Sequence, residues 1–417
     1  MKSSHPPSPI APSASGPITG ASIRQRRDTV AWRLLPLILA VFIGFLIIGL
    51  ALPVLPLQVH QTLGLSTFVV GAVAGCQFIA ALLSRAWAGG LADLRGAKTA
   101  TMIGCLIATL SGFAYLLSIG FDATPSAAAA ILMLGRASLG CAESLLVTGA
   151  LAWGVGLAGG QHAGKVMAWI GIAIYGAYAA GAPLCMALYQ IQGFAGIALA
   201  TIGLPLVALA VLASQRAIAP TAQRRVAFYK VLQAVWLPGL GLAMSSIGFG
   251  VITTFASLLF AARGWGNASL AFTAFGFAFI AARLFFGHLP DRIGGAKVAL
   301  ICVLIEAAGQ MLIWGAVTPG SALAGAALTG FGYSLAFPGF GVEAVRRAPA
   351  QSRGAAMGAY VAFLDIALAI AAPAAGAIAT SWTIGTVYLV SAVIVATSAL
   401  VALRLSGRPS ATLSRQS

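Results

Sequence analysis

The sequence contains two closely similar stretches, SRAWAGGLADLRGAKTA at residues 84–100 and ARLFFGHLPDRIGGAKVA at residues 282–299. Several residues recur between them at an offset of 198 positions (283 − 85 = 198). The matched pairs are Arg85 and Arg283, Gly89 and Gly287, Leu91 and Leu289, Asp93 and Asp291, and Gly96 and Gly294. After one inserted glycine, Lys98 recurs as Lys297. This repetition predicts that the chain is a duplicated unit.

Both copies lie in a strongly apolar chain. Of its 417 residues, 60% are hydrophobic and 8% are charged, whereas about a quarter of the residues in a soluble protein are charged. The composition therefore excludes an ordinary soluble protein and predicts an integral membrane protein. Because a spanning helix needs about 20 apolar residues, the chain can supply about twelve spans with little left for a soluble domain.

The apolar segments predict an all-α membrane protein. The spans are placed near residues 34–58, 66–88, 99–119, 127–153, 164–187, 194–213, 234–260, 268–287, 298–317, 320–342, 355–378 and 384–404. Each copy of the repeated loop then lies between the second and third span of a group of six, which predicts two pseudo-symmetric six-helix bundles. The predicted segments are a disordered tail at 1–30, bundles at 31–213 and 234–405, a linker at 214–233 and a second tail at 406–417.

Basic residues dominate the charged residues, and the formal net charge is +16. In a soluble protein this charge would suggest a nucleic-acid partner, but here nearly all Lys and Arg residues fall in alternate loops and in the tails. The positive-inside rule then predicts a multi-pass protein of the cell inner membrane with both termini in the cytoplasm and no nucleic-acid partner. The five cysteines lie in predicted helices without CxxC spacing, so we expect no metal site and no disulfide.

The repeated loop resembles the signature of the major facilitator superfamily of secondary transporters, which has the form G-x-x-x-D-x-x-G followed by basic residues. The matching residues are Gly89, Asp93, Gly96 and Lys98 in the first copy, and Gly287, Asp291, Arg292, Gly294 and Lys297 in the second. The resemblance implies two six-helix halves that rock about a central site. We expect a small-molecule substrate, no cofactor and a monomeric protein.

In the superfamily, the aspartate of this loop acts on the balance between conformations. Asp93 can pair with nearby basic side chains and with the positive end of a helix from the other half, and such contacts would latch one side closed. The alternative is that the motif only caps and orients a loop. Leu94 stands where the superfamily commonly has Arg or Lys, so Arg95 or Arg85 would supply the charge.

The stretch GRASLGCAES at residues 135–144 places Arg136 and Glu143 inside a predicted span. An arginine at the bilayer centre costs roughly 2.5–3.5 kcal/mol on insertion scales, so it needs a cavity or a partner. Seven residues make about two helical turns, which puts both side chains on one helix face, about 10.5 Å apart along the axis. Because this is too far for a direct bond, we expect a water or a group from another helix between them.

Three acids lie within predicted spans: Glu143, Glu306 and Asp365. A carboxylate that alternates between a dry environment and a pairing with arginine can take up and release a proton, so we expect the proton carrier to be one of these three. For Glu143 and Asp365 there are two alternatives, namely proton coupling or substrate contact and a purely structural role. For Glu306, on the ninth span, a structural hydrogen bond is favoured.

Other polar side chains in predicted helices are candidates to line a transport cavity, with helix packing as the alternative. They are Gln77, Tyr175, Tyr178, Tyr333 and Tyr360. Arg283 is the counterpart of Arg85 in the second copy of the repeat, near the cytoplasmic end of its span. For Arg283 a role in snorkelling or gating is favoured over substrate binding.

Further stretches resemble parts of the superfamily. The pattern LxxxRxxxG at 132–140 resembles the fourth-helix motif of proton-coupled members, and GAP at 181–183 partly resembles the fifth-helix motif of exporters. The stretches at 330–347 and 351–365 resemble the bacterial arabinose-efflux-permease-like (YhhS-type) subgroup of the drug/proton-antiporter-like branch.

The sequence thus predicts a proton-coupled secondary transporter that exports a small organic solute, such as a sugar or a drug-like compound, by antiport. No nucleotide-binding G-x-x-x-x-G-K-[ST] motif is present, so the energy source is expected to be an ion gradient. A proton symporter that imports a sugar or carboxylate is the alternative. A membrane sensor or enzyme is the remote alternative, and we expect no enzyme activity.

Overall fold

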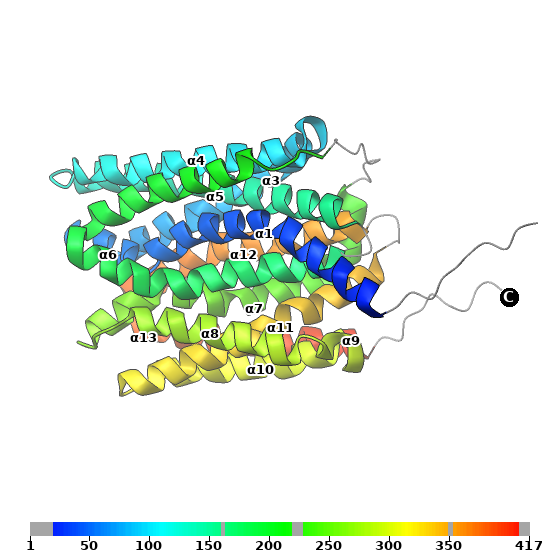
Figure 1. Cartoon of the computed structure of the whole chain (residues 1–417). Coiled ribbons are helices and arrows are strands. Elements are labelled where there is room, and N and C mark those ends of the chain that lie inside the picture. The colour runs from blue at the N-terminus through cyan, green and yellow to red at the C-terminus, as the bar shows by residue number, and fades with distance from the viewer. Residues whose placement is uncertain (1–19, 160–162, 219–227, 349–352, 408–417) are drawn as a thin grey trace, which may run out of the picture.

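The computed structural model describes residues 20–159, 163–218, 228–348 and 353–407, and nearly all of them are helical (Figure 1). The first half contains α1 (Gly20–Ala51), α2 (Leu55–Leu57), the π-helical turn η1 (Gln58–Thr62), α3 (Thr67–Arg95), α4 (Ala97–Ile119), α5 (Pro125–Ala158) and α6 (Ala163–Ala213). The second half contains α7 (Phe228–Ala262), α8 (Ser269–Phe286), α9 (Leu289–Ile293), α10 (Gly295–Trp314), α11 (Pro319–Arg347), α12 (Arg353–Ser381) and α13 (Ile384–Ser406).

The prediction of about twelve spanning helices is confirmed. In the described part of the chain, ten helices are long and apolar enough to cross a membrane. One of these, α6, is bent at Gly193, where φ is +60° and ψ is −150°, a conformation that is essentially restricted to glycine. The bend makes α6 two consecutive spans. The remaining span is α11, whose six glycines lower its mean hydropathy.

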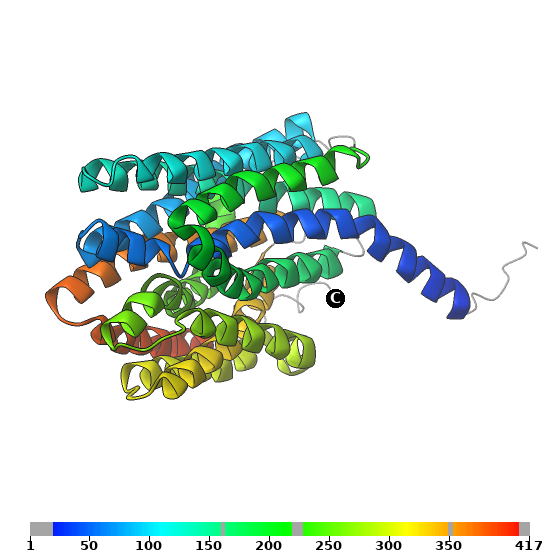
Figure 2. The ribbon, with the colours of Figure 1, turned by 60° about the vertical axis from the view of Figure 1, so that its left-hand side comes forward.

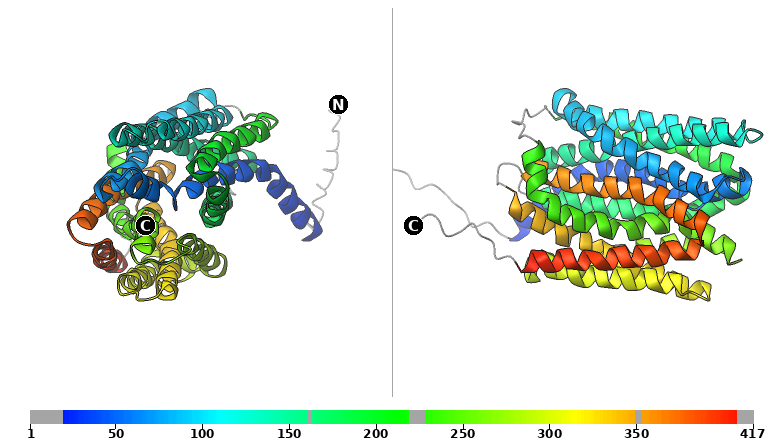
Figure 3. Two further views of the ribbon diagram at one scale, coloured as in Figure 1. Left: turned by 90° about the vertical axis from the view of Figure 1, so that its left-hand side faces the viewer. Right: turned by 180° about the vertical axis from the view of Figure 1, so that it is seen from behind.

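The two halves have the same internal packing, so the predicted pair of pseudo-symmetric six-helix bundles is confirmed. In the first half α4 packs on α5, α3 on α5 and α1 on α6, and in the second half α10 packs on α11, α8 on α11 and α7 on both α12 and α13. In both copies of the repeated loop a glycine with positive φ joins two helices, Gly96 (φ +93°) in the first and Gly294 (φ +98°) in the second. The copies differ before this glycine, since α3 runs unbroken to Arg95 whereas α8 ends at Phe286 and the short α9 follows. Seen along the bundle, the halves lie above and below one another (Figure 3).

Two segment boundaries differ from the sequence prediction. α1 begins at Gly20, so residues 20–30 continue the first helix instead of belonging to a disordered tail; alanine, arginine and glutamine in this segment are strong helix formers. α7 begins at Phe228, inside the predicted linker. Residues 1–19, 219–227 and 408–417 of the predicted tails and linker lie outside the described residues.

The halves meet along a seam made by α3 against α12 and by α6 against α8. Glycines permit the close approach of α3 and α12, because a Cβ atom at Gly75 would lie 2.9 Å from the ring of Pro373. The Thr67 hydroxyl donates to the carbonyl of Gly376 (3.0 Å) and lies 2.8 Å from the hydroxyl of Thr380. We call the end of the bundle that holds both copies of the repeated loop the repeat-loop end, and the end that holds Thr67 and Thr380 the far end (Figures 1 and 2).

Candidate functional site

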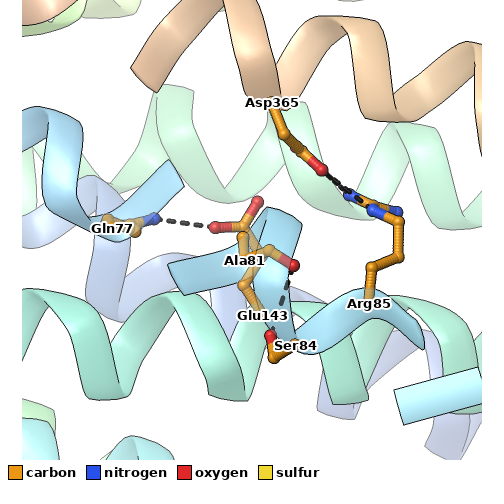
Figure 4. Close-up of polar contacts among 6 residues, drawn as sticks. All are labelled: Gln77, Ala81, Ser84, Arg85, Glu143 and Asp365. Atoms are coloured by element: carbon orange, nitrogen blue, oxygen red, sulfur yellow. Dashed lines mark hydrogen bonds and ion pairs between the residues drawn. The ribbon is translucent and has the colours of Figure 1, made fainter. Parts of the chain in front are cut away.

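An ion pair joins the two halves inside the bundle. Arg85 on α3 donates from Nε to Oδ2 of Asp365 on α12 at 2.9 Å, and its Nη2 donates to the same oxygen. The Asp365 side chain is 2% exposed, whereas Arg85 is partly exposed. The pair therefore ties α3 to α12 through a carboxylate that is almost fully removed from solvent (Figure 4).

Glu143 on α5 lies beside this ion pair and takes its hydrogen bond from α3. Gln77 Nε2 donates to Glu143 Oε2 at 2.7 Å, and Gln77 is fully buried. The contact depends on Gly140, since any side chain there would collide with the backbone of Gln77 where α5 crosses α3. Glu143 also interacts electrostatically with Asp365 and Arg85 (Figure 4). Two carboxylates and one arginine are thus gathered at the seam.

Arg136 is buried, and among the described residues its Nε and Nη1 have no hydrogen-bond partner. It borders a small pocket between the halves. The other lining residues are Leu52, Leu55, Pro56, Ala74 and Phe78 of the first half and Thr253 and Thr254 of α7. The described hydrogen bond of Glu143 goes to Gln77 and not toward Arg136, because two helical turns separate Arg136 from Glu143 whereas Gln77 lies directly across the helix crossing.

The predicted tyrosines lie at the seam among other aromatic rings. Tyr175 of α6 stacks on Phe279 of α8 with ring centroids 3.6 Å apart, which is a contact between the halves. Tyr333 stacks on Phe249 at 5.5 Å. The remaining members are Tyr178, whose ring lies 5.8 Å from Phe249, and Tyr360, whose hydroxyl donates to the Phe337 carbonyl at 2.6 Å.

Arg283 points into this aromatic cluster. Its Nη2 donates to the carbonyl of Ser334 on α11 at 2.9 Å, and its guanidinium lies 5.1 Å from the centroid of Phe279. The sequence motif groups Arg283 with the other residues of the repeated loop. In the structure it instead contacts the aromatic cluster.

The remaining loop residues lie at the repeat-loop end. Asp93, Asp291 and Arg292 are exposed and make no ion pair within the described residues. Lys98 has a role that the sequence motif does not reveal: its Nζ donates to the carbonyls of Ala213 (2.8 Å) and Gln215 (2.6 Å) at the end of α6. A cation at this position donates hydrogen bonds to carbonyls that have no partner within the helix. It also interacts favourably with the negative end of the helix dipole.

Glu306 lies away from the seam in the interior of the second half. It is fully buried, and the Ser245 hydroxyl of α7 donates to its Oε2 at 2.6 Å. This contact agrees with the structural hydrogen bond expected for Glu306, and the same helix pair carries a hydrogen bond from Gln310 to the Gly248 carbonyl.

The model of the Major Facilitator Superfamily matches residues 37–266 and 238–417, and so covers more than half of the chain. The chain belongs to the Major Facilitator Superfamily. The MFS-type transporter STM4428 of Salmonella typhimurium is 45% identical over 337 residues, which cover 81% of this chain and 87% of that protein. The MFS-type transporter YhhS of Escherichia coli is 40% identical over 377 residues, 90% of this chain and 93% of that protein. These relatives place the chain in the YhhS-type subgroup of the superfamily.

Solved structures of two other transporters share the fold. The nucleoside transporter NupG aligns with a TM-score of 0.68 at 17% sequence identity and covers 90% of this chain and 99% of that structure. The human organic anion transporter MFSD10 aligns with a TM-score of 0.62 at 15% identity over 90% of this chain and 99% of that structure. The chain therefore has the fold of these transporters.

Proposed function

We propose that this superfamily member is a proton-coupled secondary transporter that exports a small organic solute, such as a sugar or a drug-like compound, by antiport. The observation that carries the proposal is the ion pair of Arg85 and Asp365 across the seam, with the Glu143 carboxylate beside it. These groups link protonation to the contact between the halves, and that contact must change during transport.

Protonation changes the strength of this contact in a defined direction. A protonated Asp365 loses its charge and with it the attraction for Arg85, so the tie between α3 and α12 weakens. A protonated Glu143 removes a negative charge near Asp365 and so relieves the repulsion between the two carboxylates. Proton binding and release at these two acids thus bias the halves toward one arrangement or the other.

The packing of the halves supports an alternating-access cycle. The described contacts of α3 with α12 run from Thr67 and Thr380 at the far end to Arg85 and Asp365. At the repeat-loop end, α5 and α11 are not in extended contact. We assign this end to the cytoplasm, because the basic loops lie there, and we place the protein in the inner membrane with both termini inside.

The latch function of Asp93 fits this arrangement. Asp93 is exposed in this state, and it would gain partners from the other half only when the two halves meet at the repeat-loop end. The gating residues would then hold the halves together at the repeat-loop end in one state, and the contacts of α3 with α12 would hold them together in the other.

The test uses everted membrane vesicles that contain the protein. A compound screen on a strain that overproduces the transporter first identifies an exported solute. In energised vesicles, addition of that solute should release protons from the lumen, read as recovery of a quenched pH-sensitive dye. Asp365→Asn should abolish this response, because a neutral amide at this position can neither carry the proton nor pair as an anion with Arg85.

Asp122→Asn is the matched control, since Asp122 is an exposed acid in the loop between α4 and α5. It should respond as the wild type does. Movement of the solute in the same direction as the proton would instead establish symport, and solute transport unaffected by the pH gradient would end the proposal of proton coupling.

A further inference from the structure

The two arginines of the repeat have different partners across the seam. Arg85 on α3 meets Asp365 of α12. Arg283 holds the equivalent position on α8, and the helix opposite, α6, presents Gly171 there: a Cβ atom built on Gly171 would lie 3.0 Å from Arg283 Nη1. Within the described residues, no carboxylate lies within 4.0 Å of the Arg283 guanidinium. The duplicated fold therefore has one repeat arginine with a countercharge and one without.

Aromatic rings and hydroxyl groups surround Arg283. Its guanidinium lies 5.1 Å from the ring centroid of Phe279, and one described hydrogen bond joins it to the carbonyl of Ser334. Three tyrosine side chains lie near it. They belong to Tyr175, Tyr333 and Tyr360. Because a guanidinium has five N–H donors, most of its donor capacity remains for a ligand.

The charges gathered at the seam are unbalanced. Arg85, Arg136 and Arg283 contribute three positive charges, whereas Asp365 and Glu143 contribute two negative charges when both are ionised. One positive charge is left over at the seam. A charge without a countercharge is costly within a membrane bundle, and in membrane proteins such groups line substrate pathways. An anionic ligand would neutralise the excess.

We propose that Arg283 binds the carboxylate of an aromatic carboxylic acid whose ring stacks among Tyr175, Phe249, Phe279 and Tyr333. The planar guanidinium matches a carboxylate in a two-point hydrogen bond. In the described state Phe249, Phe279 and Tyr333 are buried in contact with one another, so the ring of the acid would enter as the halves separate and would stack on the faces that this exposes. The inference rests on the proposed function in that the acid is the transported solute, and it holds for either direction of transport.

The test measures binding to the purified full chain in detergent. Benzoate, phenylacetate and cinnamate are compared with their neutral amides, which have nearly the same shape, by thermal stabilisation and by displacement of radiolabelled acid. At least one acid should bind roughly 10- to 100-fold more tightly than its amide, as the loss of a charge-assisted hydrogen-bond pair predicts. Arg283→Gln should remove this preference for the acid.

Variants of other residues separate this inference from its alternatives. Arg404→Gln, at an exposed arginine near the end of α13, is the matched control and should keep the preference. Because binding is measured on purified protein without a pH gradient, acid binding is tested even if proton coupling fails. If Arg283→Gln does not yield folded protein, Arg283→Lys replaces it and should weaken acid binding, because an ammonium lacks the two-point geometry.

Three results would overturn the inference. The first is equal binding of every acid and its amide by the wild type. The second is an unchanged acid preference in folded Arg283→Gln or, where Lys replaces it, in Arg283→Lys. The third is loss of the preference in Arg136→Gln with its retention in the Arg283 variant, which would move the anion site to the pocket beside Arg136.

Discussion

At the scale of single residues, the ion pair of Arg85 and Asp365 controls the stability of the seam. Asp365 is 2% exposed, so its charge is poorly solvated if Arg85 is lost. Removing one member of a buried pair typically costs about 3–5 kcal/mol, whereas replacing both is often far less harmful. The pair therefore acts as a unit, and its two members are expected to be energetically coupled.

This coupling predicts the result of a double-mutant cycle. Arg85→Ala should lower the melting temperature in detergent more than the double variant Arg85→Ala/Asp365→Ala does, because the buried Asp365 alone would remain as an uncompensated charge. The measurement is thermal unfolding of the purified variants. Strict additivity of the two single effects would mean that the pair contributes nothing as a unit.

The arrangement around Glu143 shows what sequence can and cannot specify about a site. The seven-residue spacing correctly put Arg136 and Glu143 within one helix, and the charges in apolar spans marked Asp365 as a candidate. The pairing of Arg85 with Asp365 and the hydrogen bond from Gln77 depend on the register between different helices. Hydropathy carries no information on that register, so these partners were not predictable.

At the scale of helices, apolar segments predicted the spans well and their ends poorly. The segment predicted at 127–153 became α5, Pro125–Ala158, which extends beyond the apolar run at both ends. Helices continue past the apolar segment because backbone hydrogen bonding does not stop where hydrophobicity does. One boundary was predicted well. Gly193 divides α6 into two spans, and it lies in the gap predicted between residues 187 and 194.

Two glycines of α6 provide a matched pair to test this bend. A Cβ atom meets nothing within 4 Å at either Gly193 or Gly203, so neither substitution creates a steric clash. Only Gly193 has a positive φ. Gly193→Ala should therefore destabilise the protein by about 1–3 kcal/mol through backbone strain, whereas Gly203→Ala should leave the melting temperature unchanged or raise it slightly. Equal effects of the two variants would refute the assignment of strain to residue 193.

At the scale of the whole molecule, the two halves are similar but the seam between them is asymmetric. Equivalent helices pack in the same way within each half, yet the contact of α3 with α12 carries an ion pair and the contact of α6 with α8 carries stacked aromatic rings. The internal repeat predicted the symmetry of the fold. It could not predict this difference, because the asymmetry comes from single residues such as Gly171 and Asp365 that the repeat does not match.

Rocking of the halves requires the far end of the seam to open, and a reversible cross-link can test this. The hydroxyls of Thr67 on α3 and Thr380 on α12 lie 2.8 Å apart, so cysteines at both positions are close enough for a disulfide. Oxidised Thr67→Cys/Thr380→Cys should lose transport, and reduction should restore it. Each single cysteine variant, which retains the five native cysteines, should transport under both conditions. Full transport by protein that mass spectrometry shows to be cross-linked would mean that the far end stays closed throughout the cycle, and the halves could not alternate as proposed.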